Sequence, residues 1–315
     1  MSKRKIIIDT DPGHDDAIAI MMAGKHPKLD VLALTVVAGN QTLEKTVTNA
    51  LHICEHLDID VPIYAGMGLP MVREQVVAEY AHGKTGLDGH KVSAPPKRGP
   101  QTKHAINYII DTLLESDNDI TLVPIGPLTN IAMAMRIEPK IIPKIQEIVI
   151  MGGAYQLGNV TPCAEFNIFA DPEAAHVVFT SGAPIVMMGL DMTNKTRSIP
   201  QVRERMKNIG NIASEFFVSI TTYTAQVIEK LIGTEGGALH DATCIAWLID
   251  PGCITLKEMP VEVEIQSSKC YGRTICDYYN FRKKPANARV SVDVDLEKFW
   301  NIVEDCIRLY GKEKN

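Results

Sequence analysis

The chain has 315 residues, of which 45% are hydrophobic and 22% are charged. This composition supplies enough apolar side chains for a large core and excludes a disordered chain. The formal net charge is −6, from 32 Lys and Arg against 38 Asp and Glu, so neither nucleic acid nor a membrane surface is an expected partner.

The apolar runs of the first two thirds predict strands that alternate with helices. Short β-branched runs predict strands at 5–11, 29–40, 61–66, 119–127, 147–154 and 184–191, and helical patterns cover 15–26, 42–57, 102–116, 127–139 and 171–182. Asp171 is the expected N-cap of the last helix, with Pro172 at its first position and Glu173 in its first turn. Near-continuous apolar strands are covered on both faces. The pattern therefore predicts an α/β fold with an open, mostly parallel, doubly wound (Rossmann-like) sheet and helices on both faces.

The last third predicts small C-terminal additions to this sheet. Residues 199–232 and 241–249 have helical patterns, 260–265 and 288–295 have strand patterns, and 296–310 predicts a closing helix. The chain contains no low-complexity linker or internal repeat, so we expect one domain over 1–315. The segment 67–100 is long and rich in glycine and proline, which is typical of a mobile loop over a site.

The cysteines and the N-terminal residues bear on the compartment. The seven cysteines form no CxxC pair, and the closest two, Cys270 and Cys276, have five residues between them, which matches no metal-ligand spacing. Free thiols are typical of a reducing compartment. The sequence MSKRKIIIDTD lacks the features of a signal peptide, and no apolar run reaches the length of a membrane span. We therefore expect a cytoplasmic protein.

Polar residues follow the predicted strands at their carboxyl ends, where ligands bind in open α/β sheets. The first strand is followed by four aspartates, Asp9, Asp11, Asp15 and Asp16, and the second by Gly39 and Asn40. Polar segments also follow the fourth, fifth and sixth strands, at 125–130, 151–167 and 190–194. Their convergence at one edge indicates a ligand rich in hydroxyl groups and a hard metal ion.

The four aspartates repel one another unless a cation lies between them. The N-terminus of a helix favours an anion by only ~0.3–1 kcal/mol, which is too little to hold four carboxylates together. A divalent cation can do so, and oxygen ligands favour calcium or magnesium over zinc. The alternative is an N-cap with solvated acids. An aspartate pair after a strand also occurs in phosphotransferase folds of the haloacid-dehalogenase type.

Two further segments carry groups suited to catalysis and sugar binding. In GGALHDATCIAW (236–247), Asp241 offers another metal oxygen and His240 a proton donor, although both also suit an ordinary helix start. In NVTPCAEFN (159–167), Asn159, Glu165 and Asn167 can hydrogen-bond adjacent hydroxyl groups of a sugar. The alternative for this segment is an ordinary polar loop.

These segments together resemble a known family. DTDPGHDDAIAI, VVAGNQT, GPLTNIA, MGGAY with GNVTPCAEFNIFADPEAA, and HDATCIAWL are similar to the inosine–uridine-preferring nucleoside hydrolases, nearly from end to end. HGKTGLDG (82–89) resembles the bacterial pyrimidine-specific ribonucleoside hydrolases of this family.

The resemblance implies a glycosidase of nucleoside salvage that hydrolyses the N-glycosidic bond of ribonucleosides to ribose and free base. It implies one calcium ion per subunit and homotetramers. Asp11 would be the general base for a calcium-bound water. The implied metal ligands are Asp11, Asp16, the Ile125 carbonyl and Asp241. The implied ribose-binding residues are Asp15, Asn40, Asn159, Glu165 and Asn167, with Met151 beside the sugar. His240 and His82 would approach the leaving base, and Asp9 would support the site.

The sequence gives less evidence for the preferred nucleobase than for the other features of the site. Purine-restricted relatives stack the base between tryptophans, but Trp247 and Trp300 lie in apolar helical patterns that favour core packing. Ile228 stands where the resemblance leads us to expect a glutamine, and Tyr223 or Gln226 are candidates to compensate.

Three alternatives to a pyrimidine-preferring nucleoside hydrolase remain open. The first is a broader inosine and uridine hydrolase. The second is a magnesium-dependent phosphohydrolase with Asp9 or Asp11 as nucleophile, which the absence of an evident phosphate-binding lysine disfavours. The third is a non-catalytic module that binds ribonucleosides or calcium.

Overall fold

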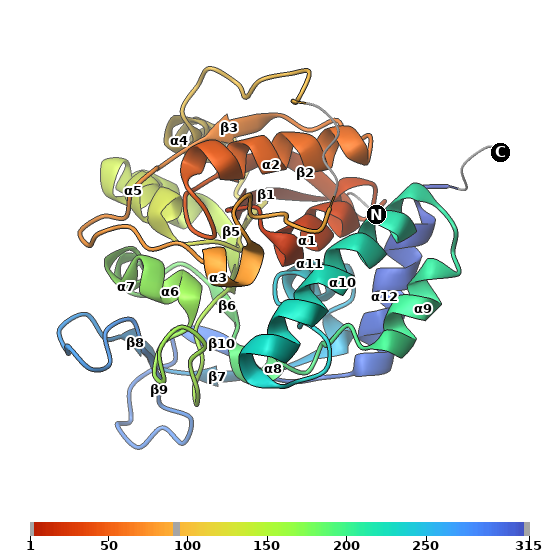
Figure 1. Ribbon diagram of the computed structural model, residues 1–315. Helices are drawn as coiled ribbons and strands as arrows, with labels where there is room; N and C mark the ends of the chain where they lie inside the picture. Colours follow the sequence, from red (N-terminus) through yellow and green to blue (C-terminus); the bar gives the residue numbers. More distant parts are fainter. Residues whose placement is uncertain (1–2, 91–94, 312–315) are drawn as a thin grey trace.

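The computed structural model describes residues 3–90 and 95–311. Within these ranges eight strands form one sheet in the order β3-β2-β1-β4-β5-β6-β10-β7, and all neighbours are parallel except β10 and β7. The strands are β1 (Arg4–Thr10), β2 (Leu29–Val36), β3 (Ile63–Ala65), β4 (Ile120–Pro124), β5 (Ile145–Met151), β6 (Ile185–Met188), β7 (Ile254–Met259) and β10 (Ala288–Val294). The predicted doubly wound α/β fold is confirmed (Figure 1).

Helices cover both faces of the sheet and bury two separate cores. One core includes residues of α1 (His14–Gly24), α2 (Leu43–His56), α9 (Pro200–Lys207), α10 (Ile212–Ile232), α11 (Ala242–Ile249) and α12 (Leu296–Arg308). The other includes residues of α4 (Ala105–Glu115), α5 (Thr129–Ile137), α7 (Pro172–Phe179) and the 3-10 helix Pro139–Lys144. Ile6 and Ile8 of β1 belong to the first core and Ile7 to the second, so this strand is apolar throughout because both of its faces are buried.

Several elements differ from the sequence prediction. Residues 199–232 form two helices rather than one, because Asn211 caps α10 by accepting a 2.8 Å hydrogen bond from the Ser214 amide. Strand β7, which pairs antiparallel at the sheet edge, is not predicted, because Thr255, Lys257 and Glu258 interrupt its apolar residues and its four central residues are partly or fully exposed. The short helices α3 (Glu79–His82), α6 (Phe166–Ala170) and α8 (Leu190–Thr193) carry too few residues for a periodic signal. The predicted cap is confirmed, since Asp171 accepts a 3.0 Å hydrogen bond from the Ala174 amide.

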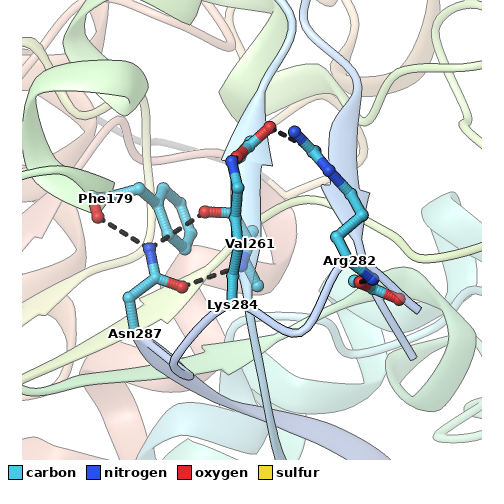
Figure 2. Close-up of polar contacts among 7 residues, drawn as sticks. Phe179, Val261, Arg282, Lys284 and Asn287 are labelled. Carbon is cyan, nitrogen blue, oxygen red and sulfur yellow. Dashed lines mark hydrogen bonds and ion pairs between the residues drawn. The ribbon is translucent and has the colours of Figure 1, made fainter. Parts of the chain in front are cut away.

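The C-terminal additions include a small hairpin beside α7. Strand β8 (Val261–Val263) pairs antiparallel with β9 (Thr274–Cys276), outside the main sheet. Asn287 donates 2.9 Å hydrogen bonds to the carbonyls of Phe179 and Val261 and accepts a 2.7 Å bond from the Val261 amide (Figure 2). Figure 2 also shows Arg282 at the edge of this unit, where its guanidinium and Lys284 pair with Glu262. These contacts fix the hairpin to the end of α7.

The single domain over 1–315 and the mobility of the segment 67–100 remain predictions. That segment contains α3, and its residues 91–94 lie outside the described residues. Among the described helices, none combines the length and the apolar character needed to span a membrane.

Candidate active site

The site lies where the strand order reverses, between β1 and β4, at the carboxyl ends of the parallel strands. Asp11 directly follows β1, and Gly126 follows β4. A Cβ atom on Gly126 would lie 2.5 Å from Oδ1 of Asp11, and a Cβ atom on Gly39 would overlap with its Oδ2. Two glycines after neighbouring strands therefore leave the space that the Asp11 carboxylate fills.

The carboxylates of Asp11 and Asp16 are fully buried, and both accept hydrogen bonds from Asn40. Asp16 accepts hydrogen bonds from the Thr10 hydroxyl at 2.6 Å, the Gly13 amide at 3.0 Å and Nδ2 of Asn40 at 3.1 Å. Oδ2 of Asp11 accepts a 2.6 Å bond from the backbone amide of Asn40. Oδ1 of Asp11 has no hydrogen-bond partner among the described residues, although it is buried. A buried oxygen of this kind is suited to a ligand or a metal ion.

The carboxylate cluster fits a hard divalent cation. Oxygens of Asp15, Asp16 and Asp241 all lie within 4.8 Å of one another. Burial raises the pKa of Asp11 and of Asp241 well above the ordinary value, and the charges of the neighbouring aspartates raise both pKa values further. Positive charge at the centre of the cluster would remove this penalty, and carboxylate oxygens are the ligands that calcium and magnesium prefer.

The cluster differs in one member from the metal ligands that the resemblance implies. It contains Asp16 and Asp241 as expected, but its third member is Asp15 rather than Asp11. The Ile125 carbonyl lies at the same sheet edge, where it accepts a 2.9 Å bond from Nδ2 of Asn167.

Asp9 lies beneath this cluster and holds strands together. Its Oδ2 accepts hydrogen bonds from the Thr35 hydroxyl at 2.6 Å and from Nδ2 of Asn130 at 2.8 Å. Its carbonyl accepts a 2.8 Å bond from the Ile125 amide. Burial raises the pKa of Asp9 to about 7. These contacts join β1 to β2, α5 and the residue that follows β4, which suits the supporting role expected of Asp9.

A cavity of about 360 Å³ opens above the cluster. It is lined by Asp15, Asn40, His82, Ile125, Met151, Asn159, Glu165, Asn167, His240 and Asp241, together with residues of α10. The two other predicted residues, Asp11 and Asp16, lie just behind Asn40, which binds both. The structure therefore brings together side chains that the sequence places after several different strands.

Glu165 organises the part of the cavity predicted to hold the sugar. It precedes α6 and accepts hydrogen bonds from the amides of Gly153 at 2.9 Å, Asn167 at 2.9 Å and Ile168 at 3.1 Å. Burial raises its pKa to about 7, and these amides oppose the rise. Asn159 accepts a 2.9 Å bond from the Phe166 amide, which ties the loop before α6 to the start of that helix.

The cavity is also lined by two histidines, His82 and His240. Nδ1 of His240 lies 2.7 Å from the hydroxyl of Thr193 in α8. Burial and the charge of Arg197 lower the pKa of His240 to about 4, so the imidazole is neutral near pH 7. Burial also lowers the pKa of His82 well below its ordinary value.

His14 is a residue of this region that the sequence analysis missed. Its Nδ1 lies 3.1 Å from Nδ1 of His82, and its Nε2 lies 2.8 Å from the Asp88 carbonyl oxygen. The Tyr223 ring stacks on the His14 ring with centroids 4.9 Å apart. His14 lies within the aspartate motif, but its partners His82, Asp88 and Tyr223 come from distant segments, and no local sequence pattern predicts these contacts.

Helix α10 gives the cavity an apolar end. Ile220, Thr224, Ile228, Leu231 and Ile232 line it, and Leu231 and Ile232 are 50% and 64% exposed. Gln226 lines a separate surface hollow with Tyr223, whereas Tyr223 contacts His14. Trp247 and Trp300 are 6% and 7% exposed, which confirms that they pack in the core.

Comparisons with known proteins give one consistent result. A family model described as inosine-uridine preferring nucleoside hydrolase matches residues 6–301. The pyrimidine-specific ribonucleoside hydrolase RihB of Escherichia coli (strain K12) is 58% identical over 312 residues, which cover 99% of each chain. The same figures hold for RihB of Shigella sonnei (strain Ss046).

Solved structures with the same fold include one that is named for a purine preference, unlike the pyrimidine-specific RihB proteins. The plant nucleoside hydrolase PpNRh1 has a TM-score of 0.90 and 32% identity, over 96% of this chain and 98% of that one. A purine-preferring ribonucleoside hydrolase from Gardnerella vaginalis has a TM-score of 0.89 and 32% identity, over 98% of each chain. The fold alone therefore does not determine which base is preferred.

Proposed function

Since the chain belongs to the inosine-uridine preferring nucleoside hydrolase family, whose members cleave the N-glycosidic bond of ribonucleosides, we propose that its preferred substrates are uridine and cytidine. The observation that carries this proposal is one cavity lined by residues of the carboxylate cluster, by two histidines and by apolar residues of α10. The identity to RihB, which is named pyrimidine-specific, supports the pyrimidine preference. Buried Trp247 and Trp300 are not available to stack on a purine.

We assign the metal site to one calcium ion per subunit, held by carboxylates of Asp11, Asp16 and Asp241 and by the Ile125 carbonyl. The oxygen donors of Asp16 and Asp241 support this assignment, and the charges of Asp15 and Asp16 lie close enough to Asp11 to raise its pKa. When bound, the cation lowers the pKa of a water and orients the ribose hydroxyls. Asp15 lies in the same cluster, so its carboxylate is within reach of both the cation and the sugar.

Asp11 is the proposed general base. Hydrolysis breaks the bond between C1′ and the base nitrogen, adds a hydroxyl group at C1′ and releases a proton from the attacking water. We assign the acceptance of that proton to Oδ1 of Asp11, because it has no hydrogen-bond partner among the described residues, whereas Oδ2 is held by the Asn40 amide. No covalent nucleophile is required in this scheme.

The proposed ribose-binding residues are Asp15, Asn40, Asn159, Glu165 and Asn167, with Met151 beside the sugar. Their amide and carboxylate groups can donate to and accept from neighbouring hydroxyls. Cleavage of a glycosidic bond develops positive charge on the sugar ring, and carboxylates on the same wall of the cavity stabilise that charge. All six residues line the cavity, which supports the assignment.

The proposed role of His240 and His82 is to assist the leaving base. His240 is neutral near pH 7, and its Nδ1 is held by the Thr193 hydroxyl, so its Nε2 is left to contact the base. His82 is held by His14 on the same wall.

Replacing His240 tests its role. His240→Ala is expected to lower kcat for uridine about 100-fold, as loss of a group that assists proton transfer does. Thr193→Val should give a smaller loss, because it frees the imidazole to rotate. Thr221→Val is the matched control, since the buried Thr221 hydroxyl bonds only the Phe217 carbonyl of its own helix. Steady-state kinetics on the three variants measure this, and an unchanged kcat for His240→Ala would exclude the role.

A nucleoside panel tests the base preference. We expect kcat/KM for uridine and cytidine to exceed that for inosine and adenosine by about tenfold or more, a ratio that differential contacts in one pocket can supply. The assay is release of reducing sugar, with chelator-treated enzyme as the blank. Equal kcat/KM values for inosine and uridine would favour the broader inosine and uridine hydrolase. The apolar residues of α10 in the cavity are also compatible with that alternative. Release of phosphate from UMP would instead indicate the phosphohydrolase.

We also propose that the enzyme is a cytoplasmic homotetramer of nucleoside salvage. Tyr279 and Phe281 near the β8–β9 hairpin are 73% and 81% exposed, and apolar surface of this kind often lies in subunit contacts. Light scattering should give about four times the mass of the chain, and a monomer mass would contradict the assembly.

A further inference from the structure

Two cysteines that the proposed reaction does not use lie in contact near the sugar-binding wall. Sγ of Cys163 is 3.4 Å from Sγ of Cys270, although the residues are 107 positions apart in the chain. Both side chains are half-buried, so small reagents can reach them. A disulfide requires a separation of about 2.05 Å, so a relative shift of little more than 1 Å would join the two sulfur atoms.

Cys163 belongs to the loop 157–165, which ends at Glu165. The Thr161 hydroxyl accepts hydrogen bonds from the amides of Cys163 at 3.2 Å and Ala164 at 2.9 Å. The Asn159 amide donates a 3.1 Å bond to the Ala164 carbonyl. A displacement of Cys163 is therefore transmitted to both Asn159 and Glu165.

Cys270 belongs to the connection between β8 and β9, which is firmly attached to the rest of the protein. The hydroxyl of the next residue, Tyr271, donates to Glu173 of α7, and the Gly272 amide donates a 2.8 Å bond to the Glu264 carbonyl. A Cβ atom on Gly272 would lie only 2.9 Å from Cα of Phe169, so the connection packs tightly on α6. Figure 2 shows that the other end of this unit is fixed by Asn287.

The loop 157–165 has exposed residues on both sides of its centre, whereas the residues that follow Cys270 are held against α7 and α6. Leu157 at its start is 72% exposed, and the Cys163 neighbour Pro162 is also exposed. If the sulfur atoms approach each other, the loop 157–165 moves toward the hairpin rather than the reverse.

We propose that Cys163 and Cys270 are a reversible disulfide site that tethers the sugar-binding loop to the β8–β9 hairpin. The oxidant is a low-molecular-weight disulfide such as oxidised glutathione. One cysteine thiolate attacks a sulfur of that disulfide, whose S–S bond breaks and releases one small thiol. The second cysteine thiolate then attacks the mixed disulfide and releases the other small thiol. Two electrons pass from the cysteines to the small disulfide, and the two thiol protons end on the released thiols.

The cross-link is expected to weaken substrate binding, and this consequence rests on the proposed function of Asn159 and Glu165. Displacing these residues weakens contacts made both before and during bond cleavage, which raises KM more than it lowers kcat. We expect KM for uridine to rise about threefold or more on oxidation, and to return with dithiothreitol.

The experiment treats the calcium-loaded protein with oxidised glutathione and compares three cysteine variants. The expected product is a peptide joining Cys163 to Cys270, with a mass 2 Da below that of the two thiol peptides, a loss that follows from removal of two hydrogens. Cys163→Ser and Cys270→Ser should form no such product and keep their KM after treatment. Cys276→Ser is the matched control, because Cys276 is another half-buried cysteine of the same hairpin, and it should still cross-link.

Two outcomes would overturn the proposal. One is the absence of the joined peptide after treatment that oxidises free thiols elsewhere in the protein. The other is a complete cross-link with an unchanged KM for uridine. Failure of the proposed function is seen separately, because the reduced protein would then not hydrolyse uridine, whereas the joined peptide is still detected or excluded by mass.

Discussion

Asp11→Asn is expected to lower kcat for uridine by about 10³-fold, within the range for loss of a general base. The asparagine keeps the size of the side chain and can still accept the hydrogen bond from the Asn40 amide. It cannot accept the proton of the attacking water. Single-turnover and steady-state assays of sugar release measure the loss.

Although the same substitution should lower activity, we do not expect it to lower the stability of the metal-free protein. Burial and the neighbouring aspartates raise the pKa of Asp11, so its charge is unfavourable in the metal-free fold. Metal-free Asp11→Asn should therefore unfold at the same temperature as the parent protein or at a higher one. A variant that loses activity because it unfolds would show the reverse.

Asp191→Asn is the matched control for these measurements. Asp191 also follows a strand at the same edge of the sheet, but its carboxylate accepts a 2.6 Å bond from the Tyr155 amide, outside the carboxylate cluster. It should retain most of the activity. Turnover by Asp11→Asn at a rate close to that of Asp191→Asn would rule out Asp11 as the base.

The sequence predicts the sheet because its strands are buried on both faces. Their central residues, such as IVIM at 148–151 and IVMM at 185–188, must then be apolar without interruption, which is a local signal. The rule that ligands bind at the carboxyl ends of such strands brings residues together without any knowledge of their contacts. It places Asp11, Asn40, Ile125 and Met151 at one edge, and the structure has them there.

The features that the sequence does not predict depend on contacts between distant segments. His14 meets His82 and Tyr223 only after the segment 79–90 and α10 have packed over the first helix. Strand β7 mixes polar and apolar residues without a clear strand pattern, and it forms by pairing with β10. The membership of the carboxylate cluster likewise depends on the turn at Pro12 and Gly13, which separates Asp11 from Asp15. Asp15, rather than Asp11, lies in the cluster with Asp16 and Asp241.

Removal of the metal ion is expected to destabilise the protein, and more so at pH 7.5 than at pH 5.5. Burial and the charge of Asp16 raise the pKa of Asp15 to about 7 in the metal-free fold, against 3.8 for an ordinary aspartate. Between these values the folded chain binds more protons than the unfolded chain, so the free energy of unfolding falls as the pH rises from about 4 to about 7. At 1.36 kcal/mol per pKa unit, the loss from Asp15 alone reaches roughly 4 kcal/mol at pH 7.5.

Calcium bound in this cluster would displace these protons, because its own ligands must be deprotonated and its charge would lie close to the Asp15 carboxylate. At 100 times its Kd it would add about 2.7 kcal/mol, which for a chain of 315 residues corresponds to a rise in Tm of roughly 4 °C at pH 7.5. The rise should be smaller at pH 5.5, where protons compete for the same carboxylates. Thermal unfolding with chelator, calcium or magnesium at both pH values measures it. Asp241→Asn should lose most of the response and Asp191→Asn should keep it, whereas equal Tm values with chelator and calcium at pH 7.5 would exclude a calcium site in this cluster.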